Sequence, residues 1–430
     1  MHIVIIGNGV AGTTCALAAR QRDADARITM ISREHPWFFS RTALMYAAMN
    51  RMPRQRLEPF ERGVYQRQRI ELVHDNVIDV DAGARTLRCA SGRALTWDRL
   101  VIAVGSRPRS IPWPGLDTVK DGVVNFVSMQ DLDALERLIP SSTHATVVGG
   151  GLIGIELVET LRYHRKPVTF LVREDWYWPV ALCRDEAAMV CEHIRGAGVD
   201  LQLMTEVAGV QADSAGRVNG VTTSQGQQIA TNLLGVCVGV QAALDGMDGW
   251  TTPPATGRGV IVDGAFRTSL DGVWAIGDCA ELKRADGSTY GETIWYSAKR
   301  HGQLVGASSL WNDRVEYTPP TFFNSSKFFE MEYTTVGDVL RLPPSTPTIR
   351  LHDARRHVSL RIVHDGNRVL GFNMLGSRWD HERLVAWVEQ RRGPEWVVDH
   401  LADAQFDVEF GRIPLKRLER SAGTLAEVNA

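Results

Sequence analysis

The sequence of 430 residues predicts an α/β fold, and three observations lead to this prediction. A short apolar strand, a GxGxxG turn and a helical pattern follow one another in residues 3–17 and again in 145–159. Each copy then continues to a second β-branched strand, near residues 29 and 169. Beyond residue 319, proline pairs and a strand hairpin replace this pattern. Repeated strand and helix patterns favour parallel sheets, and the final segment favours a smaller α+β domain.

The composition excludes several classes of protein. The 48 basic and 50 acidic side chains give a net charge of −2, which disfavours a dedicated nucleic-acid binder. No apolar run reaches the roughly 20 residues of a membrane-spanning helix, and the first residues lack a leader pattern. The six cysteines form no CxxC pair, so we expect buried thiols in a reducing compartment. We therefore expect a cytoplasmic protein with no metal, no nucleic acid and no integral membrane association.

Each glycine motif contains three positions with separate tasks. The first glycine allows the tight turn, the second lets backbone N–H groups approach a pyrophosphate, and the third lets the helix pack on the strand. These positions are Gly7, Gly9 and Gly12 in the first copy and Gly149, Gly151 and Gly154 in the second. One such motif is weak evidence, but two copies in register, each between a strand and a helix, are strong evidence for two dinucleotide sites. Each pyrophosphate is expected at the positive end of the following helix.

Two acidic residues follow strands at places where a cofactor sugar would bind. Glu34 comes 22 residues after Gly12, close to the spacing of a carboxylate that accepts from a ribose hydroxyl. Asp278 ends the strand in TSLDGVWAIGDCAE, and open α/β sheets bind ligands at the carboxyl ends of their strands. Asp278 is therefore a candidate partner for a flavin ribityl hydroxyl. The alternatives are a solvated loop acid for Glu34 and a helix N-cap for Asp278.

The ordered segments GNGVAG, LVIAVGS, VVGGGLIGIE, GVCVGV and VWAIGDCAE carry a family resemblance. Over about residues 1–337 the chain resembles the pyridine nucleotide-disulfide oxidoreductase superfamily, flavoproteins with two Rossmann-like dinucleotide-binding domains. The resemblance implies a discontinuous FAD domain in 1–115 and 250–318, an NAD(P) domain in 116–249, and a carboxyl-terminal interface domain in 319–430. Within this superfamily, FFSRTALMY resembles the flavin-side loop of the ferredoxin-reductase, NADH-oxidase and apoptosis-inducing-factor branch.

The resemblance also implies which residues bind the two cofactors. The main FAD residues are Gly7, Gly9, Gly12, Glu34, Arg41, Gly105 and Asp278. The main nicotinamide-nucleotide residues are Gly149, Gly151, Gly154, Glu156 and Arg173. The remaining predicted cofactor-binding residues are Val10, Ala11, Thr42, Val77, Ala103, Leu152, Ile153, Glu174, Gly239, Gly277 and Trp295. For Glu156 the alternative is an ordinary surface acid. No protein nucleophile or general base is predicted, because hydride transfer to flavin requires none.

The preference between NADH and NADPH is predicted from the residues that follow the strand near residue 169, which is the second strand of the second copy. Relatives selective for NADH have a carboxylate there, whereas this chain has Val172 followed by Arg173 and Glu174. A guanidinium at 173 suits forked contacts to a 2′-phosphate, which favours NADPH. Glu174 lies 20 residues after Gly154 and could serve NADH, so both nucleotides stay open, with NADPH slightly favoured.

The function is expected to be that of an FAD-dependent NAD(P)H oxidoreductase with a non-disulfide acceptor. The superfamily's disulfide reductases carry a CxxxxC or CxxC pair that this chain lacks, so electrons must pass directly from flavin to the acceptor. A ferredoxin-like protein suits the loop resemblance and the arginine-rich segment 50–69, which holds six arginines and two glutamates. For that segment the alternative is a solvated helix face.

Two other functions are kept open. One is a dehydrogenase for a quinone or a small organic acceptor, because Ser325 stands where the related reductases place an aromatic residue over the flavin. The other is a flavin-bound redox-sensing interaction protein. The oligomeric state, including a homodimer, is also left open by the sequence.

Overall fold

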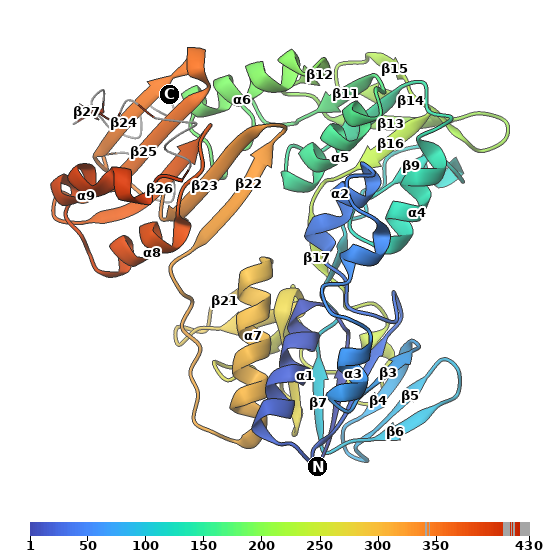
Figure 1. The fold of residues 1–430 in the computed structure, drawn as a ribbon. Helices are drawn as coiled ribbons and strands as arrows, with labels where there is room; N and C mark the ends of the chain where they lie inside the picture. The colour runs from blue at the N-terminus through green and yellow to red at the C-terminus, as the bar shows by residue number, and fades with distance from the viewer. Residues whose placement is uncertain (340–341, 344, 407–412, 414, 416–417, 422–430) are drawn as a thin grey trace. The chain divides into compact units, whose positions relative to one another are not determined.

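The computed structural model describes residues 1–430 except 340–341, 344, 407–412, 414, 416–417 and 422–430. The chain divides into two compact units (Figure 1). The first unit contains Met1–Ile111, Asn125–Glu136 and Gly239–Thr318. The second unit contains Pro112–Val124, Arg137–Val238 and Pro319–Ala430. Part of the carboxyl-terminal domain expected at 319–430 therefore lies outside the described residues.

The first unit is built on a five-stranded parallel sheet. Its order is β19 (Val273–Ala275), β7 (Arg99–Ile102), β1 (His2–Ile6), β2 (Arg27–Ser32) and β3 (Ile70–His74). The interior of β1 is fully buried, as expected for a strand covered on both faces. Helix α1 (Val10–Arg22) follows β1 directly, and the short helices α2 (Leu44–Ala48) and α3 (Gly63–Arg67) lie on the connection from β2 to β3.

Helix α7 (Trp295–Ala307) packs closely beside α1, and the two helices are seen side by side in Figure 1. Two glycines of α7 make this approach possible. A Cβ atom on Gly302 would lie 2.3 Å from the Ala11 carbonyl oxygen, and one on Gly306 would lie 2.4 Å from that of Cys15. Any larger side chain would force the helices apart.

Three small sheets complete the first unit. One is antiparallel and contains β4 (Val77–Asp81), β5 (Thr86–Cys89) and β6 (Ala94–Thr96). A two-stranded ribbon pairs β17 (Val240–Ala242) with β8 (Ser106–Pro108). The third contains β18 (Val260–Val262), β20 (Ala280–Lys283) and β21 (Thr289–Gly291).

The second unit repeats the parallel sheet. Its order is β12 (Val199–Gln202), β11 (Val168–Leu171), β10 (Ala145–Val148), β16 (Leu233–Val236) and β9 (Val123–Val124). Strand β10 occupies the place of β1, and α5 (Leu152–Tyr163) follows it as α1 follows β1. The sheet is accompanied by α6 (Arg184–Gly196) and by the antiparallel strands β13 (Val207–Ala212), β14 (Val218–Thr223) and β15 (Gln228–Ala230). Helix α4 (Met129–Leu138) spans the boundary between the units in sequence.

The carboxyl-terminal part of the second unit is an antiparallel sheet with two helices. Its strand order is β22 (Phe323–Phe328), β23 (Met331–Gly337), β26 (Val369–Leu375), β25 (Val358–His364), β24 (Thr348–Asp353) and β27 (Glu419–Ser421). Helices α8 (His381–Glu389) and α9 (Pro394–His400) follow the hairpin of β25 and β26. This confirms the expected hairpin and the smaller α+β element.

These sheets confirm the predicted fold class, with two Rossmann-like halves and a smaller α+β part. The functional boundaries of the three expected domains stay a proposal. Within the described residues, all six cysteines are free and buried. No helix of the described part has the length and apolar character needed to span a membrane.

Candidate functional site

The first glycine turn has the shape of a pyrophosphate cradle. Gly7 has φ of +108°, and a Cβ on it would lie 2.2 Å from the Ala103 carbonyl oxygen. A Cβ on Gly12 would lie 2.0 Å from the Gly7 carbonyl oxygen, so helix and turn are in close contact. A Cβ on Gly9 would meet nothing within 4 Å, and Gly9 caps α1 without a side-chain hydrogen bond. Unpaired N–H groups and open space at the same helix end are what an anion needs.

The second turn repeats this geometry. Gly149 has φ of +110°, and a Cβ on it would lie 2.2 Å from the Cys237 carbonyl oxygen. A Cβ on Gly154 would lie 2.0 Å from the Gly149 carbonyl oxygen. Gly151 faces open space and caps α5 without a side-chain hydrogen bond or an acid in the first turn. The same three tasks are therefore met in both copies, and the residues fit two dinucleotides.

Glu34 and Arg41, predicted for separate parts of the FAD site, are joined in the structure. An Arg41 guanidinium nitrogen lies 2.9 Å from Glu34 Oε1, and the same guanidinium donates to the Val127 carbonyl oxygen. The Met129 backbone N–H also donates to Glu34 Oε1 at 3.3 Å. Glu34 is thus not a free loop acid, and its carboxylate is held at the end of β2.

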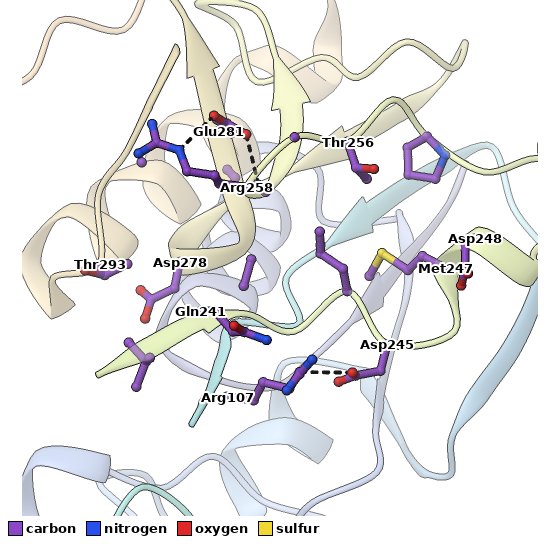
Figure 2. A pocket seen from close by; sticks show the side chains of 18 of the residues that line it. Arg107, Gln241, Asp245, Met247, Asp248, Thr256, Arg258, Asp278, Glu281 and Thr293 are labelled. Atoms are coloured by element: carbon purple, nitrogen blue, oxygen red, sulfur yellow. Dashed lines mark hydrogen bonds and ion pairs between the residues drawn. The ribbon is translucent and has the colours of Figure 1, made fainter. Parts of the chain in front are cut away.

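Asp278 lies in the wall of a cavity of about 980 Å³ within the first unit, a volume at the upper end for small-molecule sites (Figure 2). Burial raises the pKa of its carboxyl, while the hydrogen bond from Ser106 Oγ (2.8 Å) and the charge of Arg41 oppose this shift. The short helix Gly277–Cys279 has Ile276 as its N-cap, so the N-cap alternative for Asp278 is wrong. None of the other predicted cofactor residues lines this cavity.

The remaining FAD-side residues lie at several places in the first unit. Ala103 and Gly277 approach the glycine turn and its helix, since a Cβ on Gly277 would lie 2.9 Å from the Ala11 Cβ. Thr42 lies in the exposed turn beside Arg41, and its hydroxyl is 3.1 Å from that of Ser40. Val77 begins β4 in the antiparallel sheet, and Trp295 begins α7. Val10 and Ala11 occupy the first turn of α1, and Leu152 and Ile153, on the nucleotide side in the second unit, occupy the first turn of α5.

The nucleotide-specificity residues are paired with each other. Arg173 Nε lies 3.0 Å from Glu174 Oε1, and the Arg173 side chain is 71% exposed. The Arg173 guanidinium is therefore accessible to a ligand even though it is paired with Glu174.

Gly239, with φ of +100°, belongs to the first unit, where its carbonyl accepts from the Arg109 N–H at 3.0 Å.

The carboxyl of Glu156 is not that of an ordinary surface acid, because its surroundings change its pKa. Burial and the neighbouring Glu159 raise the pKa of its carboxyl to about 7, and Lys327 opposes the shift. The Lys327 ammonium pairs with Glu159 across α5 and β22. Sequence reasoning missed both Glu159 and Lys327, because nothing in the local pattern shows that β22 packs against α5.

Most arginines of the segment 50–69 form ion pairs with carboxylates. Arg54 pairs with Asp133 and lies 3.5 Å from Glu136, while Arg62 pairs with Glu58 at 2.7 Å. Arg67 and Arg69 also have carboxylate partners. Arg56 is exposed and has no ion pair among the described residues. The free positive charge of this segment is therefore smaller than its sequence indicates.

Each of the two glycine turns lies between a strand of a parallel sheet and the following helix, and this arrangement is typical of proteins that bind two dinucleotides. A family model described as "Pyridine nucleotide-disulphide oxidoreductase" matches residues 1–302. The chain belongs to this family and is an FAD-dependent NAD(P)H oxidoreductase. This confirms the resemblance identified in the sequence.

The chain is similar to curated and solved reductases over most of its length. It is 32% identical to the chlorobenzene dioxygenase ferredoxin reductase component of Cupriavidus sp., covering 72% of this chain and 74% of that protein. It is 31% identical to the 5,5′-dehydrodivanillate O-demethylase ferredoxin reductase subunit of Sphingobium sp., covering 98% of each. A ferredoxin reductase structure from Rhodopseudomonas palustris matches with a TM-score of 0.77 and 23% identity, covering 87% of this chain and 91% of that one.

Proposed function

We propose that this protein passes electrons from NAD(P)H through FAD to a small ferredoxin-like iron–sulfur protein. The observation that carries the proposal is a complete pair of dinucleotide cradles without a thiol pair, since all six cysteines are free and buried. A chain without an accessible dithiol has no protein relay to a disulfide substrate. The names of two relatives, both ferredoxin reductase components or subunits, support the acceptor class.

The residues of the first unit would hold FAD, which accepts hydride from the nicotinamide and releases electrons to the acceptor. The N–H groups at the start of α1 would donate to the pyrophosphate, with Gly9 leaving the space for it. Glu34 would accept from the adenosine ribose, and Asp278 from the ribityl chain. Arg41 would hold Glu34 in place and turn its remaining donors to the cofactor.

The residues of the second unit would hold the nicotinamide nucleotide. Gly149, Gly151 and Gly154 repeat the cradle, and Glu156 would lie at the reactive end of the bound nucleotide. The exposed Arg173 guanidinium favours NADPH, because it can exchange its contact with Glu174 for a 2′-phosphate. A cytoplasmic, reducing setting fits six buried free thiols.

The acceptor is tested by stopped-flow reoxidation of the reduced protein. A ferredoxin is expected to reoxidise it rapidly, and a quinone slowly. If docking involves charges such as that of Arg56, the rate with ferredoxin falls as salt rises, and Arg56→Glu lowers the low-salt rate. Faster reoxidation by a quinone than by any iron–sulfur protein would contradict the proposed acceptor. A reduced protein that no acceptor reoxidises would instead favour a redox-sensing interaction protein.

A further inference from the structure

A fully buried histidine of the first unit contacts the backbone turn that leads into the cavity wall. His301 is on α7 and is 0% exposed. Its ring packs against two aromatic rings that also contact each other, with centroids 4.5 Å from that of Phe266 and 4.9 Å from that of Tyr317. These contacts fix the plane of the imidazole, so its two nitrogens point in fixed directions.

The two nitrogens have partners of opposite kinds. The backbone N–H of Gly277 is directed at Nδ1, with a distance of 3.2 Å. Nε2 lies 3.0 Å from Oε2 of Glu292. A backbone N–H can only donate, so Nδ1 must accept and carries no proton. Nε2 then carries the proton and donates it to the Glu292 carboxylate, which makes His301 a neutral imidazole of one defined tautomer.

Glu292 is itself held as an acceptor. The Tyr317 hydroxyl donates to the same Oε2 atom at 2.7 Å. Burial by itself would raise the pKa of Glu292, but the hydrogen bonds from His301 and Tyr317 bring it below its ordinary value. The carboxylate therefore stays ionised and keeps the proton of His301 on Nε2.

Both segments that His301 joins continue directly into the cavity wall. Gly277 precedes Asp278, and Glu292 precedes Thr293, and both Asp278 and Thr293 line the cavity and are labelled in Figure 2. Gly277 has φ of +73°, a backbone conformation that glycine adopts readily and other residues rarely do. Its N–H has His301 as acceptor.

We infer that His301 is a positioning residue of the flavin site. Its neutral imidazole fixes the Gly277–Asp278 turn against the Glu292–Thr293 segment, so that the Asp278 carboxylate is held where a ribityl hydroxyl can donate to it. The inference rests on the proposed assignment of Asp278 to FAD. No single sequence motif indicates this role, because the five residues come from three separate segments.

Two substitutions separate the two hydrogen bonds of His301. An Asn side chain places its polar end near the position of Nδ1, and a Gln side chain places it near that of Nε2. His301→Asn can therefore keep an acceptor for Gly277, whereas His301→Gln keeps only the contact with Glu292. Both variants remove the ring contacts with Phe266 and Tyr317, and their side chains differ by only one methylene group.

The experiment measures the FAD dissociation constant of the holoenzyme by dilution, following flavin fluorescence. His301→Gln is expected to raise this constant by about 3- to 10-fold relative to His301→Asn, the range for one lost hydrogen bond. Equal constants in the two variants, or a weaker His301→Asn, would overturn the inference. Thermal unfolding of both variants is recorded, because a merely structural role would change stability without separating the two constants.

A second measurement needs no variant. In the wild-type holoenzyme labelled with ¹⁵N-histidine, the His301 ring is expected to show the neutral pattern with the proton on Nε2. A proton on Nδ1, or a doubly protonated ring near neutral pH, would overturn the inference. If the wild-type protein retains no flavin at all, the proposed function fails instead, and the ¹⁵N pattern still tests the hydrogen bonds of His301.

Discussion

Arg41 and Glu34 form an ion pair in the first unit, with a guanidinium nitrogen 2.9 Å from Glu34 Oε1. The Glu34 side chain is only 20% exposed, and the Met129 N–H donates to the same oxygen. Glu34, predicted to contact a ribose, and Arg41, in the predicted flavin-side loop, thus support each other. The pair links the loop after β2 to the segment that contains Val127 and Met129.

Glu34→Gln is expected to weaken FAD binding by about 10-fold, because an amide loses the charged acceptor for both Arg41 and the ribose hydroxyl. The FAD dissociation constant of the purified variant checks this. Glu58→Gln is the control, since Glu58 also pairs with an arginine of the same unit at 2.7 Å. Equal flavin loss in the two variants would show that Glu34 has no specific contact with FAD.

Asp278→Asn is expected to reduce the flavin content of the purified protein, whereas Ser106→Ala should have a smaller effect in the same direction. Asn keeps the size of Asp278 but loses the carboxylate, and Ser106→Ala removes one hydrogen bond that favours its ionised form. The ratio of flavin absorbance to protein absorbance measures both. Full flavin content in Asp278→Asn would exclude a role for this carboxylate.

Glu156 is expected to make folding stability depend on pH. The pKa of its carboxyl is raised to about 7 in the folded protein, so the folded state binds this proton more tightly than the unfolded state does. Its contribution is fully present in acid and is lost as the pH rises through about 7. Chemical denaturation across this range should show the decline, and Glu156→Gln should remove it.

Lys327→Met provides the companion test for Glu156. Lys327 lowers the pKa of Glu156, so its loss should move the stability decline to higher pH. An unchanged pH profile in both variants would mean that Glu156 does not titrate with a raised pKa.

Arg361 and Glu186 form a buried pair in the second unit, with two nitrogen–oxygen distances of 2.9 Å and no exposure of either side chain. Arg361→Met is expected to destabilise the protein by about 3–5 kcal/mol, because Glu186 stays buried without its charge partner. Denaturant unfolding measures this. Arg67→Met, at the exposed pair of Arg67 with Glu61, is the control and should have little effect. A similar loss in both variants would contradict the burial argument.

Arg173→Ala is expected to raise the KM for NADPH by about 10-fold while changing that for NADH little, because only NADPH has a 2′-phosphate for the guanidinium. Steady-state rates with both nucleotides and an artificial acceptor check this. Equal effects on both nucleotides would mean that Arg173 does not contact the 2′-phosphate.

The features that the sequence predicted best are those that a short stretch of residues determines. The positive φ of Gly7 and Gly149, and the open space at Gly9 and Gly151, follow from a motif of six residues and appear in the structure in both copies. The parallel sheets follow from the same repeat.

Contacts between distant residues could not be predicted in this way. Arg361 and Glu186 are separated by 175 positions, and Lys327 and Glu159 by 168. Similarly, nothing near His301 in the sequence distinguishes it from an ordinary helix residue, because its partners Gly277 and Glu292 come from other segments. The arginine-rich segment shows the opposite error, since its charge is evident in the sequence but its acidic partners Asp133 and Glu136 are not.

Anaerobic titration of the purified protein with NADH and with NADPH tests the central claim most directly. The flavin absorption is expected to bleach with one equivalent of nucleotide and to recover when an oxidised ferredoxin is added. A protein without flavin absorption, or a flavin that neither nucleotide bleaches, would contradict this claim.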